Sequence, residues 1–240
     1  MTALRPREAS GFSLIELAVV VVVIALILGS ILVPLNTQVR QRNVAETERI
    51  LEETRQALVG YAMVNGYLPQ PAKSATDGRE QDVTAQKCAT GTPTNCTGFI
   101  PWAALGTPRA DAWGKLIRYS VNPRYTTTIP ATQFSSTQDQ RTVRTRDATG
   151  TAVDLATNLP AVVFSHGADN YGTTIEGTAL PDGPDANNDE DANATAGATV
   201  FWSRTATDNP SASGGEFDDL VAWIPPGQLF TQLVAAGKLP

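Results

Sequence analysis

Histidine, cysteine and positive charge are all scarce in this chain. Its 240 residues include one histidine, His166, and two cysteines, Cys88 and Cys96, and the formal net charge is −6. A metal site built on the two cysteines would lack the further cysteine and histidine ligands that zinc requires. An acidic chain also lacks the basic surface on which nucleic-acid binding depends, so no nucleic-acid partner is expected.

Motifs for catalysis and cofactor binding are missing as well. The sequence contains no glycine-rich phosphate loop and no dinucleotide fingerprint. Ser165, His166 and Asp169 supply the residue types of a hydrolase triad, but no nucleophile elbow surrounds Ser165. We therefore expect that the protein is not an enzyme.

Charge is absent from residues 17–39, and residues 17–33 are almost pure valine, isoleucine, leucine and alanine. Seventeen helical residues rise roughly 25 Å, which is enough to cross most of a bilayer core. A buried core helix is disfavoured because residues 19–23 are five valines without a polar face. A secretory signal peptide is disfavoured because the small residues at 9–11 precede the apolar run instead of following it.

A carboxylate, Glu16, stands almost at the start of this apolar run. A lone carboxylate in hydrocarbon costs about 2.5–3.5 kcal/mol on insertion scales, so it needs a partner unless it sits at the headgroup boundary. Arginines flank both ends of the run, at 5 and 7 and at 40 and 42, so charge counting leaves the orientation open.

The stretch "GFSLIEL" followed by an apolar helix resembles the N-terminal signature of type IV pilins and type II secretion pseudopilins. The resemblance implies that a prepilin peptidase removes a leader, residues 1–11, by cutting after Gly11. It also implies that Phe12 is N-methylated and that Glu16 pairs with the N-terminal ammonium of a neighbouring subunit. These two charges are costly in lipid and satisfy each other only when subunits pack side by side.

The same resemblance sets the expected location. The leader stays in the cytoplasm, residues 12–35 cross the bacterial inner membrane once, and the C-terminal domain lies in the periplasm. The subunit then joins a filament in the periplasm or at the cell surface. The expected partners are copies of itself or related pilins, the peptidase and the inner-membrane assembly platform.

Residues 36–66 continue as an amphipathic helix, past Pro34, which would kink or break it. Asn65-Gly66 predicts its end. One face of this helix carries residues at three- and four-residue steps: Val44, Thr47, Leu51, Thr54, Leu58 and Ala62.

Residues 67–240 predict a globular domain. Residues 67–99 have the composition of a long loop, and runs at 116–121, 160–165, 198–204 and 219–225 predict strands separated by turns. A short helix is predicted after Pro225-Pro226, ending at Gly237. The expected fold is α+β, with the long N-terminal helix packed on a small antiparallel β-sheet with long loops.

Cys88 and Cys96 lie in the first of these loops. Because the resemblance places the loop outside the cytoplasm, a disulfide between them is the expected state.

Two further segments extend the resemblance to the major pseudopilins. "DAWGKLIRYSV" is similar to the motif that opens their sheet, and "FSHGADNYG" with "GGEFDDLVAWI" is similar to segments that enclose a calcium-binding loop. Carried over by motif, Asp169, Asp218 and Asp219 are the expected carboxylate ligands of calcium, helped by carbonyls near Ser165 and His166.

A long insertion with a second acidic cluster separates these two segments. Asp185, Asn187 and Asp189 have the alternate spacing of a calcium loop. However, Glu190 stands where that loop requires glycine, and Ala196 stands where it requires glutamate. A solvated acidic loop is the favoured interpretation of this insertion.

The favoured function is therefore a structural subunit, major or minor in copy number, of a type IV pilus or type II secretion filament, assembled through its N-terminal helix. The alternative is a membrane-anchored periplasmic binding or adhesive module that uses the long polar loops at 126–158 and 177–215. The sequence does not distinguish a pilus from a secretion pseudopilus, or a major from a minor subunit.

Overall fold

The computed structural model describes residues 13–81, 88–89, 91–135, 138–169, 171–181, 183 and 187–239, with the backbone alone at 28–36 and Pro93. The chain divides into two compact units, residues 1–42 and 43–240. Helix α1, Leu14–Asn65, begins in the first unit and ends in the second. The expected long N-terminal helix is therefore present.

In the first unit, the side chains of residues 13–27 are exposed. The backbone remains helical through 28–36, so Pro34 does not end α1. Across the residues whose side chains are described, which leave out 28–36, no helix is both long and apolar enough to cross a membrane.

In the second unit, α1 buries the face that its sequence pattern predicts. Thr47, Leu51, Thr54, Leu58 and Ala62 are each no more than 2 % exposed. The charged residues of the same stretch lie on the outer side, where Glu46, Arg49 and Glu53 form ion pairs one turn apart. The helix ends at Asn65 because Gly66 adopts a left-handed conformation with φ 81°, as the Asn65-Gly66 pair predicted.

The main sheet packs on this buried face. Its strand order is β1-β2-β5-β9, and each neighbouring pair is antiparallel. The bounds are Thr97–Phe99, Arg118–Val121, Ala161–Ser165 and Leu220–Ile224. Three of these strands confirm the runs predicted at 116–121, 160–165 and 219–225.

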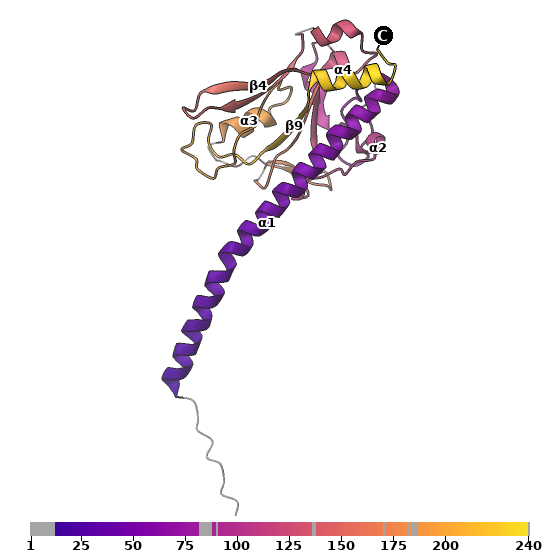
Figure 1. Cartoon of the computed structure of the whole chain (residues 1–240). Coiled ribbons are helices and arrows are strands. Elements are labelled where there is room, and N and C mark those ends of the chain that lie inside the picture. The colour runs from indigo at the N-terminus through magenta and orange to yellow at the C-terminus, as the bar shows by residue number, and fades with distance from the viewer. Residues whose placement is uncertain are drawn as a thin grey trace, which may run out of the picture. The chain divides into compact units, whose positions relative to one another are not determined.

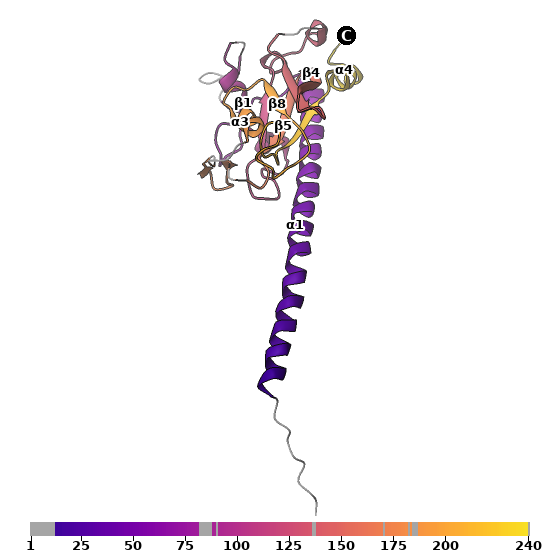
Figure 2. The ribbon, with the colours of Figure 1, turned by 90° about the vertical axis from the view of Figure 1, so that its left-hand side faces the viewer.

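Strand β5 lies at the centre of the domain and is buried on both faces (Figure 2). Ala161 and Val163 join the core cluster that contains the α1 residues, while Val162 and Phe164 join a second cluster with Phe201. Side chains alternate across a strand, so the fully apolar run of β5 serves both cores.

The second core is closed by a smaller sheet of order β4-β3-β8, with bounds Ala152–Leu159, Arg141–Arg146 and Val200–Trp202. Strand β8 confirms the run at 198–204, but it pairs with β3 in parallel. The fold is α+β as expected, and this parallel pair is an addition to the predicted antiparallel sheet.

Two segments expected to be loops contain regular structure. The 126–158 segment forms most of the β3–β4 hairpin. The acidic insertion forms helix α3, Asn188–Ala194, in which Asp189, Glu190 and Asn193 are buried. The interpretation of this insertion as a solvated loop was therefore wrong for its described residues 187–194, because Asp189, Glu190 and Asn193 have partners inside the domain.

The remaining elements are short. Helix α4, Pro226–Ala235, confirms the predicted C-terminal helix and buries Leu229 and Leu233 beside the C-terminal part of α1 (Figure 1). The others are α2 Trp102–Leu105, β6 Gly172–Thr173, β7 Ala179–Leu180 and the 3₁₀ helices η1 Pro93–Cys96, η2 Pro123–Tyr125 and η3 Ala131–Ser135.

Candidate functional site

The first turn of α1 holds Glu16 in a reciprocal pair of hydrogen bonds. The Ser13 backbone N–H donates to Glu16 Oε2 at 2.9 Å, and the Glu16 N–H donates to Ser13 Oγ at 3.3 Å. This is a capping box, which satisfies two of the donors that every helix N-terminus leaves free. Gly11 and Phe12, the predicted cleavage and methylation residues, lie outside the described residues.

A second candidate site is a group of three carboxylates in the second unit. Carboxylate oxygens of Asp169, Glu190 and Asp218 all lie within 4.8 Å of one another. Glu190 and Asp218 are buried, whereas Asp169 is exposed. Asp169 and Asp218 are two of the residues that the motif predicted.

The antiparallel strands β5 and β9 bring this acidic cluster together. Ser165 at the end of β5 is opposite Leu220 at the start of β9, so the segments that carry Asp169 and Asp218 are neighbours. Gly167, with φ 55°, allows the close approach, because a Cβ there would overlap the Asp218 side chain. Helix α3 supplies Glu190 from the insertion.

Hydrogen bonds hold the two buried carboxylates but do not saturate them. The Asp218 N–H donates to Glu190 Oε1, and Asn187 Nδ2 donates to Glu190 Oε2 at 3.2 Å. The Ala168 N–H donates to Asp218 Oδ2 at 2.7 Å. Asp218 Oδ1 is buried and has no hydrogen-bond partner among the described residues. One acceptor therefore remains available inside the cluster.

Burial and mutual repulsion make both side chains weak acids. Burial and the nearby Asp219 raise the pKa of Glu190 to about 8. Burial and the nearby Asp169 raise the pKa of Asp218 to about 6. Carboxylates that repel one another in a poorly solvated site favour a proton or a cation.

A buried cation beside the cluster, the ammonium of Lys115, binds backbone oxygens. Lys115 Nζ donates to the carbonyl of His166 at 3.1 Å and to the carbonyl of Asp169. Burial lowers the pKa of Lys115, and the surrounding carboxylates oppose this effect. The His166 carbonyl was expected to assist a calcium ion. In this chain that carbonyl instead accepts a hydrogen bond from Lys115.

The other predicted carboxylates have different partners. Asp219 accepts from Asn193 Nδ2 at 2.7 Å, and its Oδ1 lies 3.5 Å from His166 Nδ1. Asp189 binds Arg146 at 2.6 Å and lies 2.9 Å from Arg204 Nε. Neither belongs to the three-carboxylate cluster.

Of the remaining residues predicted in the insertion, Asn187 uses its amide to donate to Glu190, and Asp185 lies outside the described residues. Sequence reasoning missed Glu190 as a member of the cluster. The sequence analysis noted Glu190 only because it stands where a calcium loop requires glycine. No local sequence pattern predicts that Glu190 lies close to Asp218.

Ser165 and His166 lie beside separate carboxylates. Ser165 Oγ donates to Asp111 Oδ2 at 2.6 Å, while the His166 ring faces Asp219. The two side chains therefore face different carboxylates and not each other.

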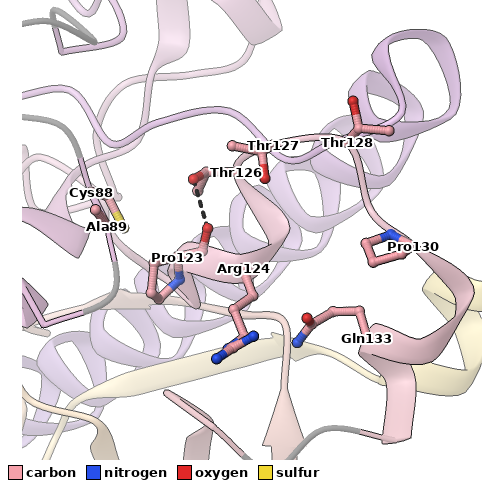
Figure 3. A pocket seen from close by; sticks show the side chains of 9 residues that line it. All are labelled: Cys88, Ala89, Pro123, Arg124, Thr126, Thr127, Thr128, Pro130 and Gln133. Carbon is pink, nitrogen blue, oxygen red and sulfur yellow. Dashed lines mark hydrogen bonds between the residues drawn. The ribbon is translucent and has the colours of Figure 1, made fainter.

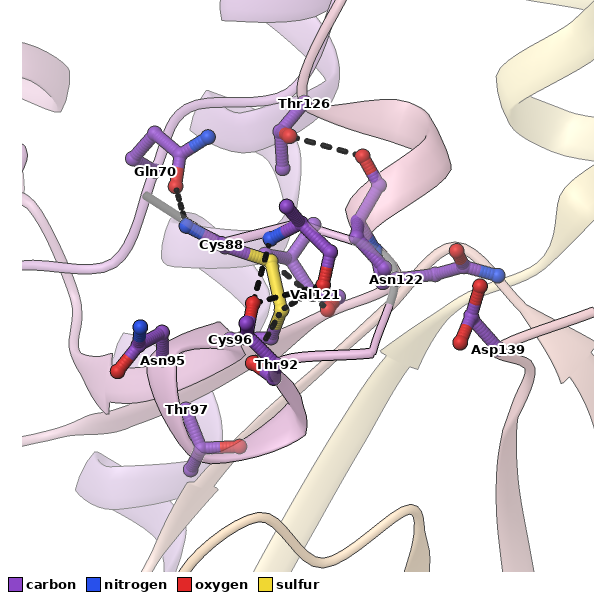
Figure 4. Close-up of a disulfide and its surroundings, with 12 residues drawn as sticks. Gln70, Cys88, Thr92, Asn95, Cys96, Thr97, Val121, Asn122, Thr126 and Asp139 are labelled. Atoms are coloured by element: carbon purple, nitrogen blue, oxygen red, sulfur yellow. Dashed lines mark hydrogen bonds between the residues drawn. A yellow bond between two sulfur atoms is a disulfide. The ribbon is translucent and has the colours of Figure 1, made fainter. Parts of the chain in front are cut away.

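The predicted disulfide between Cys88 and Cys96 is present (Figure 4). Both cysteines are buried, and the Cys88 N–H donates to Gln70 Oε1 at 2.9 Å. The disulfide thus fixes part of the 67–99 segment against the core that contains α1 and the main sheet.

Comparison with known proteins identifies one segment of the chain. Residues 6–32 match the family model described as the prokaryotic N-terminal methylation motif. Neither the curated proteins nor the solved structures provided a match. The motif implies processing by a prepilin peptidase and assembly into pilus-like filaments. The chain therefore carries, at residues 6–32, the N-terminal methylation motif that is the signature of type IV pilins and pseudopilins.

Proposed function

We propose that the protein is a structural subunit of a type IV pilus or a type II secretion pseudopilus. After cleavage behind Gly11, the chain begins at Phe12, is N-methylated there and is anchored in the inner membrane by residues 12–35. The observation that supports this proposal is the methylation motif at residues 6–32 together with Glu16 in the first turn of α1. The periplasmic unit then becomes the surface of the filament.

Glu16 is the residue on which assembly depends in this proposal. Within one chain its carboxylate accepts from the Ser13 N–H, an interaction that a neutral amide side chain can also make. In the filament, the carboxylate binds the ammonium of a neighbour's Phe12, and this interaction requires the negative charge.

Three variants separate the charge from the capping box. Glu16→Gln keeps the capping hydrogen bond and removes the charge, Glu16→Ala removes both, and Ser13→Ala weakens the cap and keeps the charge. We expect both Glu16 variants to lower filament incorporation at least about tenfold at unchanged membrane abundance. Ser13→Ala should still assemble. Immunoblots of sheared filaments against membrane fractions measure the ratio, and normal incorporation of Glu16→Gln would refute the proposal.

We also propose that the second unit binds calcium at Asp169, Glu190 and Asp218. Three converging carboxylates with one unpartnered buried oxygen suit a hard cation that prefers oxygen ligands. Bound calcium would supply positive charge where the buried acids repel one another. The site differs from the motif-based expectation because Glu190 takes part and the His166 carbonyl binds Lys115.

A thermal-shift titration of the full chain in detergent tests this site separately from assembly. Calcium at millimolar concentration should raise the Tm of the wild type and of Glu176→Gln, an exposed control. It should leave the Tm of Glu190→Gln nearly unchanged. A wild-type Tm that does not respond to calcium would exclude the site and leave the filament proposal intact.

A further inference from the structure

A polar cavity of about 330 Å³ lies beside Cys88 of the disulfide (Figure 3), and its lining includes none of the three carboxylates of the acidic cluster. Its walls come from η2, η3 and the segment between them, with Cys88 and Ala89 on one side. This volume is at the lower end of the range for small-molecule sites and suits a ligand the size of a sugar acid or a dipeptide.

The cavity contains hydrogen-bond donors that have no acceptor. Gln133 is 5 % exposed, and its Nε2 has no partner among the described residues. Arg124 Nε lies 3.6 Å from Asp139 Oδ2, but neither atom makes a hydrogen bond there. In Figure 3 the amide nitrogen of Gln133 points toward the Arg124 side of the cavity. A buried donor without an acceptor is unfavourable, so a ligand acceptor placed here would gain free energy.

The cavity lining carries one cation and, among the described residues, no acid. Arg124 is that cation, and the carboxylate nearest to it, Asp139, lies outside the lining with its Oδ2 3.6 Å from Arg124 Nε. A guanidinium offers five N–H donors in a planar fork that matches a carboxylate. Thr127 and Thr128 add exposed hydroxyl groups, and the rings of Pro123 and Pro130 add apolar surface.

Local hydrogen bonds order the backbone that carries the donors. The buried Asn122 caps η2 by accepting from the Arg124 N–H at 3.0 Å. Thr126 Oγ1 donates to the Pro123 carbonyl at 2.8 Å, and the Gln133 N–H donates to the Pro130 carbonyl at 2.9 Å. A site whose backbone is already ordered loses less conformational entropy on binding.

We propose that this cavity binds a small carboxylate ligand, with Arg124 and Gln133 as its two principal donors. The carboxylate belongs either to a sugar acid or to the C-terminus of a short peptide, since both present the same group at this size. The site gives the filament subunit a ligand-binding property that assembly through α1 does not require.

Ligand-observed NMR on the full chain in detergent tests the proposal. The probes are galacturonate and N-acetyl-Ala-Ala, each compared with its neutral form, the methyl ester and the C-terminal amide. We expect saturable binding of at least one carboxylate probe at millimolar concentration or below, and binding about tenfold or more weaker for its neutral form. Which probe binds identifies the source of the carboxylate.

Substitutions of lining residues test whether the carboxylate binds in this cavity. Arg124→Lys keeps the charge but loses the planar fork, and Gln133→Leu removes the amide; each should weaken binding several-fold. Arg124→Met should weaken it at least about tenfold. Arg79→Met, at an exposed arginine outside the lining, should bind as the wild type does.

Three results would overturn the proposal. These are no saturable binding of either carboxylate, equal binding of the neutral forms, and full affinity in variants at both Arg124 and Gln133. An unchanged Tm and an intact disulfide in each variant show that a loss of binding is not a loss of folding.

Discussion

Buried acidic residues in this protein have contrasting partners. Asp189 is 1 % exposed and lies between two arginines, whereas Glu190 beside it faces other carboxylates. The first arrangement pairs a carboxylate with two cations, and the second favours the protonated or cation-bound form of Glu190. Adjacent residues of α3 therefore have opposite electrostatic roles.

The acidic cluster predicts a pH dependence of folding stability in the presence of a chelator. The pKa of Glu190 is about 8 in the folded chain against 4.5 ordinarily, so between these values the folded state binds more protons than the unfolded state. Stability should thus fall as pH rises from about 5 to about 8, by at most about 1.4 kcal/mol per pH unit for this group. Asp218 contributes in the same direction at pH values below about 6.

Urea denaturation at several pH values measures this slope. Glu190→Gln should flatten the profile, while Glu176→Gln should keep the wild-type slope. The same steep profile in Glu190→Gln would show that the dependence arises elsewhere.

Some residue contacts were predictable from short patterns. These are the disulfide between the two cysteines and the proximity of Asp169 to Asp218. The roles of Glu190, Gln133 and Lys115 were not predictable, because they depend on contacts with residues distant in the sequence. The neighbouring residues in the sequence do not predict that tertiary contacts will bury a polar side chain.

Among the secondary-structure elements, those with a strong hydrophobic pattern were predictable. The buried face of α1 and the apolar strands β5 and β9 follow directly from periodicity. The hairpin β3–β4 was missed because β3 is rich in arginine and β4 is largely exposed. Helix α3 was missed because it has only seven residues and is held by polar contacts instead of an apolar face.

Mutation can test the ion pairs that attach α3 to the rest of the second unit. Arg146 and Arg204 bind Asp189 and also lie over aromatic rings, at 4.5 Å from the Trp202 centroid and 4.6 Å from the Phe217 centroid. Asp189→Asn leaves both cations without their carboxylate, so we expect a loss of about 3 kcal/mol in the free energy of unfolding.

Asp154→Asn is the matched control, because the Arg144–Asp154 pair is exposed and should contribute no more than about 1 kcal/mol. Chemical denaturation of both variants gives the comparison. Equal losses would show that the two-arginine contact does not anchor α3.

The disulfide closes a loop between residues separated by eight positions. Replacing both cysteines with serine should lower the free energy of unfolding by about 2.5 kcal/mol, because the unfolded chain regains the entropy of the open loop. Denaturation of the double variant beside the oxidised wild type measures this difference. A reduced wild type that matches the oxidised one in stability would contradict it.

At the scale of the whole molecule, the chain combines a motif-bearing N-terminal unit with a unit that has its own cores. The second unit, residues 43–240, holds the buried clusters, the disulfide, the acidic cluster and the cavity. The methylation motif and the long N-terminal helix were predictable because both follow from local features of the sequence. The second sheet, with its parallel β3–β8 pair, was not, because strand partners are chosen by long-range packing.

The N-terminal sequence of the membrane-extracted protein tests the filament proposal most directly. Intact mass and N-terminal peptide analysis should find a chain that begins at Phe12 and carries one added methyl group, with residues 1–11 removed. The Gly11→Val variant should keep its leader. A wild-type protein that retains Met1 and an unmodified leader would contradict the account, because Glu16 would then have no neighbouring ammonium to bind.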